Sequence, residues 1–252
     1  PPGHSEQRGF GMSNVHIVLQ GKGGVGKSLA ASMLAQYLTK RGESPLCIDT
    51  DPINATLAGF QSLNVSKVEL LENGDINPRK FDAMMEMIAG SKESVVIDSG
   101  ASSYSALSSY MFDNGAPDVI ADLGHKLILH TIIVGGQSLI DTLQGFASVA
   151  EAFPDPAAIV VWLNPYHGPV EAEGKSFEQL KAYRELKDRV AAIVTLPDLK
   201  KETFGADVRD MLAARKTFEE TLADGDIALM QRHRLGRVRD AVFAELDKAK
   251  VV

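Results

Sequence analysis

The stretch Gly21-Lys22-Gly23-Gly24-Val25-Gly26-Lys27-Ser28 decides the fold. It matches the pattern GxxxxGK[ST] of a phosphate-binding loop, whose glycines let successive backbone N–H groups converge on phosphate oxygens. An apolar run at 15–19 precedes the loop, and an apolar pattern with helical spacing from Leu29 to Leu38 follows it. The N-terminus of that helix adds a positive dipole end to the anion site. The sequence therefore predicts a polyphosphate site between a strand and a helix.

The loop also supplies two side chains for phosphate chemistry. Lys27 is predicted to reach the β- and γ-phosphates, and the Ser28 hydroxyl to be a ligand of Mg²⁺. Asp98 follows the apolar run 95–97 and fits the acid that holds this metal through water at the end of a buried strand. The predicted nucleotide-binding residues of the loop and the first helical turn are Gly23, Gly24, Val25, Gly26, Lys27, Ser28 and Leu29.

Two further acids, Asp49 and Asp51, follow the apolar run 45–48. In parallel sheets ligands gather at the carboxyl ends of strands, and alternation along an extended chain points these two side chains to the same side. Asp51 is predicted to orient the attacking water and to join the metal site, and Asp49 to support the metal. The alternative for either acid is to cap a short helix that begins near Asn54.

Short apolar runs alternate with helical patterns along the chain, with later runs at 127–134, 158–163 and 191–196. The intervening stretches are long enough for crossover helices of a buried parallel sheet. The sequence predicts an α/β three-layer P-loop NTPase fold, with a mostly parallel central sheet flanked by helices. Residues 12–252 are expected to form one domain, and 1–11 are interpreted as a cloning-derived tail.

Composition narrows the class of protein. The chain has 252 residues, of which 44% are hydrophobic and 23% charged, as in ordinary globular proteins. No apolar run is long enough for a transmembrane helix. The single Cys47 excludes a disulfide framework and a cysteine-ligated cluster within one chain, and it suits the reducing cytoplasm. His16 and His130 lie in apolar runs without metal-site spacing, so structural roles are expected for both.

The main basic cluster lies on the last helical pattern, and its members are Arg232, Arg234, Arg237 and Arg239. The net charge of −7 argues against nucleic acid binding over the whole surface, but a local patch can still bind non-specific DNA. The alternative is that the arginine stems lie around a packed apolar stripe formed by Leu235, Val238, Val242 and Leu246.

The motif residues resemble those of a known family. The segment 22–28 resembles the deviant Walker A motif of ParA/MinD-type ATPases, in which Lys22 is the signature lysine; 47–56 and 95–98 are similar to the family's second motif and Walker B strand. Asn164 matches the asparagine that reads adenine, and Pro197 lies in a segment similar to the base-flanking loop. The resemblance implies ATP and Mg²⁺ as cofactors.

The family resemblance also implies partners. It implies a homodimer on ATP binding, in which Lys22 of one subunit contacts phosphate on the other and acts catalytically. The stretches GKGGVGKS, VVWLNPYHGP and GKSFEQLKAY resemble TraL-type conjugal-transfer proteins over nearly the full length. This implies a cytoplasmic ATPase that assists conjugative DNA transfer together with DNA-processing or transfer proteins. The segment 99–103 replaces the usual proline-containing segment, so this switch is expected to respond differently to nucleotide.

Other functions use a similar core. An ATP-dependent ligase of the dethiobiotin-synthetase kind shares the fold, but generally lacks the lysine found here at Lys22. An electron-delivering ATPase similar to the nitrogenase iron protein needs two cysteines per subunit, and this chain has one. A nucleotide-binding module without hydrolysis, a plasmid partition ATPase and a MinD-like positioning protein all remain alternatives.

Overall fold

The computed structural model describes residues 13–153 and 157–250, so the tail expected at 1–11 lies outside the described residues. Seven strands form the central sheet in the order β11-β8-β7-β1-β6-β2-β3, and every neighbouring pair is parallel. These strands are β1 (Asn14–Val18), β2 (Leu46–Asp49), β3 (Ser66–Lys67), β6 (Val95–Asp98), β7 (Lys126–Val134), β8 (Ala158–Asn164) and β11 (Val190–Thr195). The predicted α/β three-layer fold is confirmed.

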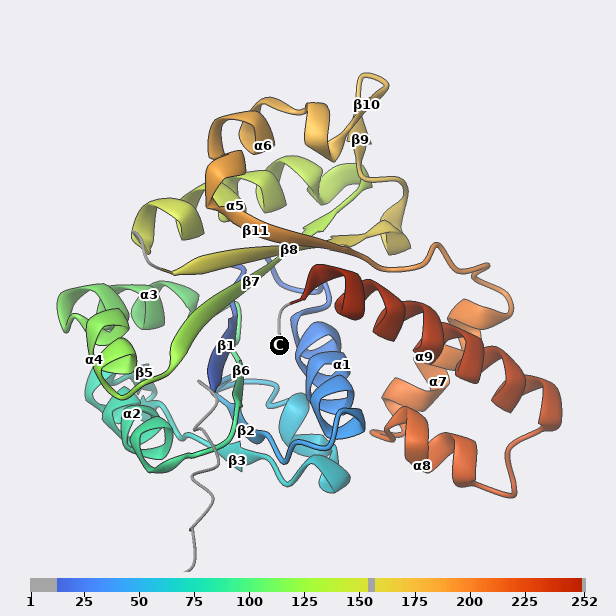
Figure 1. Ribbon diagram of the computed structural model, residues 1–252, viewed down its shortest axis with the longest axis horizontal. Helices are drawn as coiled ribbons and strands as arrows, with labels where there is room; N and C mark the ends of the chain where they lie inside the picture. The colour runs from blue at the N-terminus through green and yellow to red at the C-terminus, as the bar shows by residue number, and fades with distance from the viewer. Residues whose placement is uncertain (1–12, 154–156, 251–252) are drawn as a thin grey trace, which may run out of the picture.

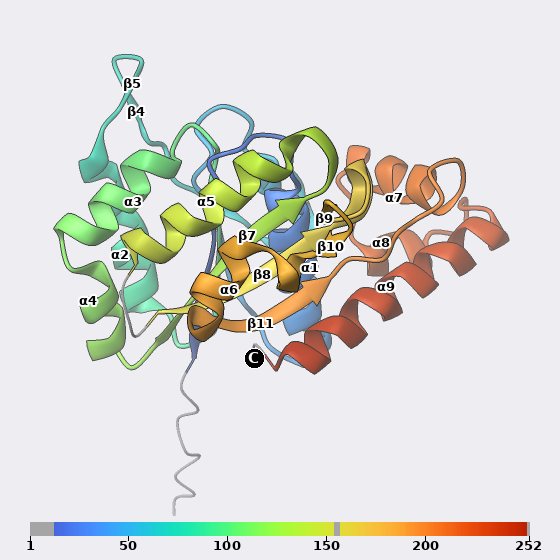
Figure 2. The ribbon, with the colours of Figure 1, turned by 90° about the horizontal axis from the view of Figure 1, so that it is seen from above.

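Helices cover both faces of this sheet (Figure 1). They are α1 (Lys27–Lys40), α2 (Phe81–Gly90), α3 (Tyr104–Asp113), α4 (Ala116–Asp122), α5 (Leu139–Ala152), α6 (Lys181–Leu186), α7 (Phe204–Ala213), α8 (Phe218–Ala223) and α9 (Leu229–Ala249). None of the described helices has both the length and the apolar content to cross a bilayer. The turned view in Figure 2 shows α7, α8 and α9 together at one end of the molecule.

Two apolar cores separate the three layers. Successive side chains of a strand point to opposite faces of the sheet. Ile17 therefore packs with α2 to α5, whereas Val18 packs with α1 and α9. Both faces are therefore dry, which explains why the strands are continuous apolar runs. The predicted stripe on α9 is buried along its whole length, from Leu235 to Leu246. Packing of α9 on the sheet follows from that stripe.

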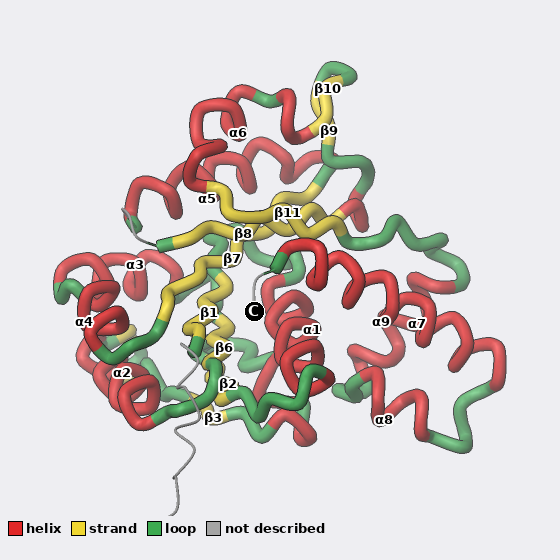
Figure 3. Tube along the Cα trace, viewed as in Figure 1, coloured by secondary structure: helices red, strands yellow, loops and turns green. Residues whose placement is uncertain are grey.

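Several short elements were not expected from the sequence pattern. Two-residue strands form the hairpins β4 (Leu71–Glu72) with β5 (Asp75–Ile76) and β9 (Glu171–Ala172) with β10 (Lys175–Ser176). Figure 3 shows one of them, the β9–β10 hairpin, outside the central sheet. Single turns of 3₁₀-helix are η1 (Leu57–Gly59), η2 (Gln61–Leu63), η3 (Pro78–Lys80), η4 (Gly136–Ser138), η5 (Pro165–His167), η6 (Phe177–Gln179) and η7 (Lys187–Arg189). Elements this short are set by tertiary contacts and not by periodicity.

Two buried histidines form a hydrogen-bonded chain inside the sheet. Trp162 Nε1 donates to His130 Nδ1 at 2.9 Å, so His130 Nε2 carries the proton and donates to His16 Nδ1 at 2.9 Å. Burial lowers the pKa of His16 to about 3, and the positive charge of Lys126 adds to this effect. Burial also lowers the pKa of His130 well below its usual range. Both imidazoles are therefore neutral, and their roles are structural.

We expect this histidine chain to make stability depend on pH. Below about pH 6.5 the unfolded chain binds protons that the folded protein does not, so the free energy of unfolding falls as the pH decreases, by about 1.4 kcal/mol per pH unit for each histidine. For His16 the fall continues to about pH 3. Urea unfolding at pH 7, 6 and 5 measures the slope. A His16→Leu, His130→Met double variant is expected to be flatter, and an unchanged slope would contradict this explanation.

Candidate nucleotide-binding site

The predicted phosphate loop lies between β1 and α1. Gly24 and Gly26 adopt φ values of 73° and 102°, a region that side-chain-bearing residues rarely occupy, so the loop requires glycine at both positions. Gly26 directly precedes Lys27, the first residue of α1, and its carbonyl accepts from Ala30 N. The first N–H groups of α1 therefore open onto the loop, as an anion site at a helix N-terminus requires.

Strand register brings the other acidic residues to this loop. Asp98 pairs with Val18 on one side and with Asp49 on the other, so β1, β6 and β2 end at the same level. A cavity of about 390 Å³ lies over the loop at this edge of the sheet. We call it the phosphate chamber, and the predicted residues that line it are Gly23, Gly24, Gly26, Lys27, Ser28, Leu29 and Asp51. Val25 is buried beneath the loop.

Lys27 is buried at the floor of the phosphate chamber. Its Nζ donates to the Lys22 carbonyl oxygen at 3.1 Å, within the loop itself. Burial lowers the pKa of Lys27, although the negative charges of Asp98 and Asp51 oppose that change. An ammonium group held by one neutral acceptor in a buried position has unused donors. It is therefore ready to bind phosphate oxygens.

Asp98 is fully buried at the end of β6, and among the described residues neither carboxylate oxygen has a partner with good hydrogen-bond geometry, although the Ser28 hydroxyl lies near enough to favour the ionised form. Burial raises the pKa of Asp98 to about 7; Asp49 and Asp51 act in the same direction, whereas Ser28 and Lys27 oppose it. An unpaired buried carboxylate is costly unless a cation balances it. The oxygen donors of Asp98 and Ser28 fit Mg²⁺, which takes few protein ligands and completes its shell with phosphates and water.

Asp49 is bound to the backbone of the loop that follows β2. Its Oδ1 accepts from the Asp51 backbone N–H and its Oδ2 from the Ala58 N–H, both at 2.9 Å. Both oxygens are thus engaged with the backbone, and Asp49 does not line the phosphate chamber. These contacts agree with the alternative, in which Asp49 caps a short helix, and its support of the metal stays a prediction. That helix is η1 at Leu57–Gly59, a few residues after the expected start.

Asp51 lies in the phosphate chamber as predicted. Its Oδ1 accepts from the backbone N–H groups of Ile53 and Asn54, at 2.9 and 3.1 Å, which fixes the carboxylate in place. Gly100 makes this position possible, since a Cβ there would lie 2.6 Å from Asp51 Cγ. The segment 99–103 that replaces a proline-containing segment therefore places a glycine against the Asp51 carboxylate.

Lys22 points away from the phosphate chamber of its own chain. Its Nζ forms an ion pair with Asp141 Oδ2 at 2.7 Å, and both side chains are about half exposed. Asp141 lies in the first turn of α5, so this contact joins the loop to another helix. Exposed ion pairs of this kind contribute about 0–1 kcal/mol and are readily exchanged for another partner. The contact with a second subunit stays a prediction.

A second cavity of about 440 Å³ lies beside the phosphate chamber, and we call it the base chamber. Asn164 and Pro197 both line it, as expected for residues around a nucleotide base. Asn164 Nδ2 donates to the Val25 carbonyl at 3.0 Å, and its Oδ1 accepts from Tyr166 N at 3.1 Å. The amide thus connects the end of β8 to the phosphate loop. The chamber wall is largely apolar, as the faces of a base require.

The basic cluster on α9 is mostly engaged within the chain. Arg234 pairs with Asp207, Arg239 pairs with Glu219 and Asp240, and the Arg237 guanidinium lies 5.9 Å from the centre of the Phe204 ring. These contacts agree with the alternative in which arginines surround a packed helix. DNA binding by Arg232, Arg234, Arg237 and Arg239 stays a prediction.

Sequence reasoning missed several residues of this site, of which three matter most for the argument. Phe60 and Arg215 line the phosphate chamber, and Asp141 holds Lys22. Phe60 directly follows η1, in the loop that Asp49 and Asp51 hold through its backbone N–H groups. Its place in the sequence soon after Asp51 could therefore have marked it as a residue of the site. Asp141 and Arg215 are far from any motif, and no local pattern identifies them.

Comparison with known proteins agrees with this geometry. Residues 16–228 match the family model of the CobQ/CobB/MinD/ParA nucleotide binding domain. Protein TraL of Escherichia coli is 52% identical over 241 residues, covering 96% of this chain and 100% of that protein. Protein MobD of Acidithiobacillus ferrooxidans is 28% identical over 193 residues, covering 74% of this chain and 78% of that protein.

A solved structure shows the same fold. The MinD cell division protein of Aquifex aeolicus superposes with a TM-score of 0.53 at 14% identity, covering 94% of this chain and 97% of that one. This likeness concerns the fold alone, whereas the family match and the TraL relative rest on sequence. The chain therefore belongs to the CobQ/CobB/MinD/ParA nucleotide-binding domain family, as a TraL-type member.

Proposed function

We propose that this protein is a Mg²⁺-dependent ATPase that acts as an ATP-driven dimer switch in conjugative DNA transfer. The observation that carries the proposal is the fully buried Asp98 carboxylate, which has no geometric hydrogen bond within the described part of the chain. Its pKa responds to Lys27 and Ser28, two residues that line the phosphate chamber. A structural carboxylate in this position would be expected to have a partner. A carboxylate that binds a metal ion needs no such partner, because the cation balances its charge.

The chain's own residues account for nucleotide binding. The backbone of the loop and the Lys27 ammonium bind the phosphates, and the apolar base chamber with Asn164 receives the adenine. Ser28 and Asp98 hold Mg²⁺, which neutralises phosphate charge when bound. Asp51 keeps one carboxylate oxygen for the chamber while the other is fixed by the backbone, so it can orient a water molecule.

The surface around the site supports pairing of two copies. Ile53, next to Asp51, is 71% exposed, and Ile140, next to Asp141, is 59% exposed. Apolar side chains at the rim of a nucleotide site are suited to burial against a second subunit. Lys22 lies outside its own chamber and forms an exchangeable ion pair, so it is available to a bound nucleotide across the interface.

The role in conjugative transfer rests on the 52% identity to TraL. In this role the ATP-bound pair binds a DNA-processing or transfer protein in the cytoplasm, and hydrolysis releases it. Nucleotide thus sets the order of assembly and disassembly.

Phosphate release tests the ATPase proposal. The parent is expected to bind a fluorescent ADP analogue and to release phosphate from ATP only with Mg²⁺. Lys27→Ala removes a charged donor to phosphate and is expected to weaken nucleotide binding by about 10- to 100-fold. Equal phosphate release by parent and Lys27→Ala, or no nucleotide binding by the parent, would refute the proposal.

A further inference from the structure

The end of α7 has a backbone conformation that favours glycine, and an arginine occupies it. Arg215 N donates to the Leu212 carbonyl at 3.1 Å, and Lys216 N donates to the Met211 carbonyl at 3.2 Å. These two bonds form the Schellman motif that closes many helices, in which glycine is the usual residue at the left-handed position. Arg215 has a φ of 54° there. A residue kept in a strained conformation is often kept for its side chain.

The Arg215 side chain lies where the two chambers meet. It lines both the phosphate chamber and the base chamber. Its stem runs against Gly59, because a Cβ at Gly59 would lie 2.9 Å from Arg215 Cδ. No carboxylate in the described part of the chain forms an ion pair with it, whereas the adjacent Lys216 is paired with Asp224 at 2.7 Å. An arginine at the boundary of an anion site therefore has donors to spare.

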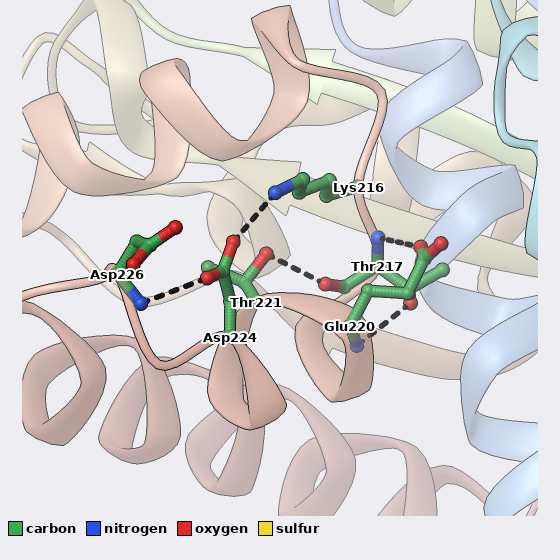
Figure 4. Close-up of polar contacts among 6 residues, drawn as sticks. All are labelled: Lys216, Thr217, Glu220, Thr221, Asp224 and Asp226. Carbon is green, nitrogen blue, oxygen red and sulfur yellow. Dashed lines mark hydrogen bonds and ion pairs between the residues drawn. The ribbon is translucent and has the colours of Figure 1, made fainter.

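Polar contacts fix the segment after Arg215, as Figure 4 shows for Lys216 with Asp224 and for Thr217 with Glu220. Thr217 and Glu220 form a capping box at the start of α8. Glu220 also accepts from the Ser62 hydroxyl of η2 at 2.9 Å, and the Phe218 N–H donates to the Gln36 side chain of α1 at 2.7 Å. The segment is thus connected both to the helix that follows the phosphate loop and to the turn that follows Asp51.

We propose that Arg215 binds the phosphate tail of the adenine nucleotide, as a cation supplied by the α7–α8 segment in addition to the loop lysines. This inference rests on the proposed nucleotide function. Guanidinium groups suit phosphate oxygens because their donors form a planar fork. Arg215 acts in binding, from a position that borders both chambers. The strain at the end of α7 is retained because glycine lacks this cation.

Arg215→Gly separates stability from binding. Glycine fits the left-handed backbone, so the thermal midpoint of this variant is expected to equal or exceed that of the parent. Titration with fluorescent ADP is expected to give a roughly tenfold higher Kd, since a charge-assisted contact is lost. Pyrophosphate competition is expected to weaken similarly, whereas adenosine binding is expected to stay unchanged. Arg215→Lys should recover part of the ADP affinity, and Arg184→Ala, at an exposed arginine of α6, is the matched control.

The outcomes separate this inference from the proposed function. If the parent binds ADP, Lys27→Ala does not, and Arg215→Gly binds like the parent, the role of Arg215 is wrong and the ATPase proposal stands. An equal loss of adenosine and ADP affinity would assign Arg215 to the nucleoside and also overturn the phosphate contact. A parent protein that binds no ADP would refute both.

Discussion

Lys22→Ala is expected to lower the turnover number for ATP by about 10³- to 10⁵-fold, the range for a cation supplied to phosphate across an interface. The nucleotide affinity of the single subunit should change little, because Lys22 does not line the phosphate chamber of its own chain. Lys27 and the loop backbone remain to bind the phosphates. Steady-state phosphate release at saturating ATP, together with a fluorescent ADP titration, measures the two quantities separately.

Asp141→Asn is the matched control for Lys22. It removes the same 2.7 Å ion pair from the other side, but leaves the lysine available. If Lys22 acts only by holding α5, both variants should have the same activity. The proposal expects Asp141→Asn to keep turnover near or above that of the parent, while Lys22→Ala loses it. Parent-like hydrolysis by Lys22→Ala would refute the contact across the interface.

Asp98→Asn is expected to stabilise the nucleotide-free protein and to impair hydrolysis. The amide has nearly the same shape, but it removes a buried charge without a partner, so the free energy of unfolding at pH 8 should rise by about 1–3 kcal/mol. Since the pKa of Asp98 is raised to about 7, this gain should shrink as the pH falls below 7, where the parent takes up a proton. Loss of a group that holds Mg²⁺ through water should lower Mg²⁺-dependent turnover by about 10- to 100-fold.

Asp113→Asn is a matched control, because Asp113 is exposed at the end of α3. Surface substitutions of this kind change the free energy of unfolding by about 0.5 kcal/mol or less. Urea unfolding with and without Mg²⁺ and ADP measures both effects. A destabilised Asp98→Asn variant with normal Mg²⁺ dependence would show that Asp98 is a structural residue.

Much of the fold follows from local sequence. The strand, glycine loop and helix around Lys27 have both a hydrophobic periodicity and a sequence motif. In a parallel sheet, the apolar runs are expected to end at the same edge. That placement puts Asp51 in the phosphate chamber and Asp98 at the end of the neighbouring strand, without knowledge of any tertiary contact. Asn164 was singled out by the family resemblance, and it lines the base chamber at the end of β8.

The division of labour between Asp49 and Asp51 could not be predicted. Both follow the same strand, and alternation alone gives them equal access to the site. The difference arises from η1, whose Ala58 N–H reaches Asp49 Oδ2 and removes this acid from the chamber. A 3₁₀ turn of three residues leaves no periodic signal in the sequence. The hydrogen bond from this turn to Asp49 could therefore not be predicted.

Contacts between distant segments were also beyond the sequence pattern. Asp141 meets Lys22 from a helix 119 positions away in the chain. Arg215 reaches the nucleotide chambers from the end of α7, and contacts of Ser62 and Gln36 connect the following α8 segment to the site. The absence of glycine at the end of α7 carries meaning only after the left-handed conformation of that position is known.

Light scattering with Mg²⁺ and either ADP or a slowly hydrolysed ATP analogue tests the central claim most directly. We expect a mass near 27.1 kDa with ADP and about twice that value with the ATP analogue, with no doubling for Lys22→Ala. The same mass with both nucleotides, under conditions where each is bound, would contradict an ATP-driven dimer switch.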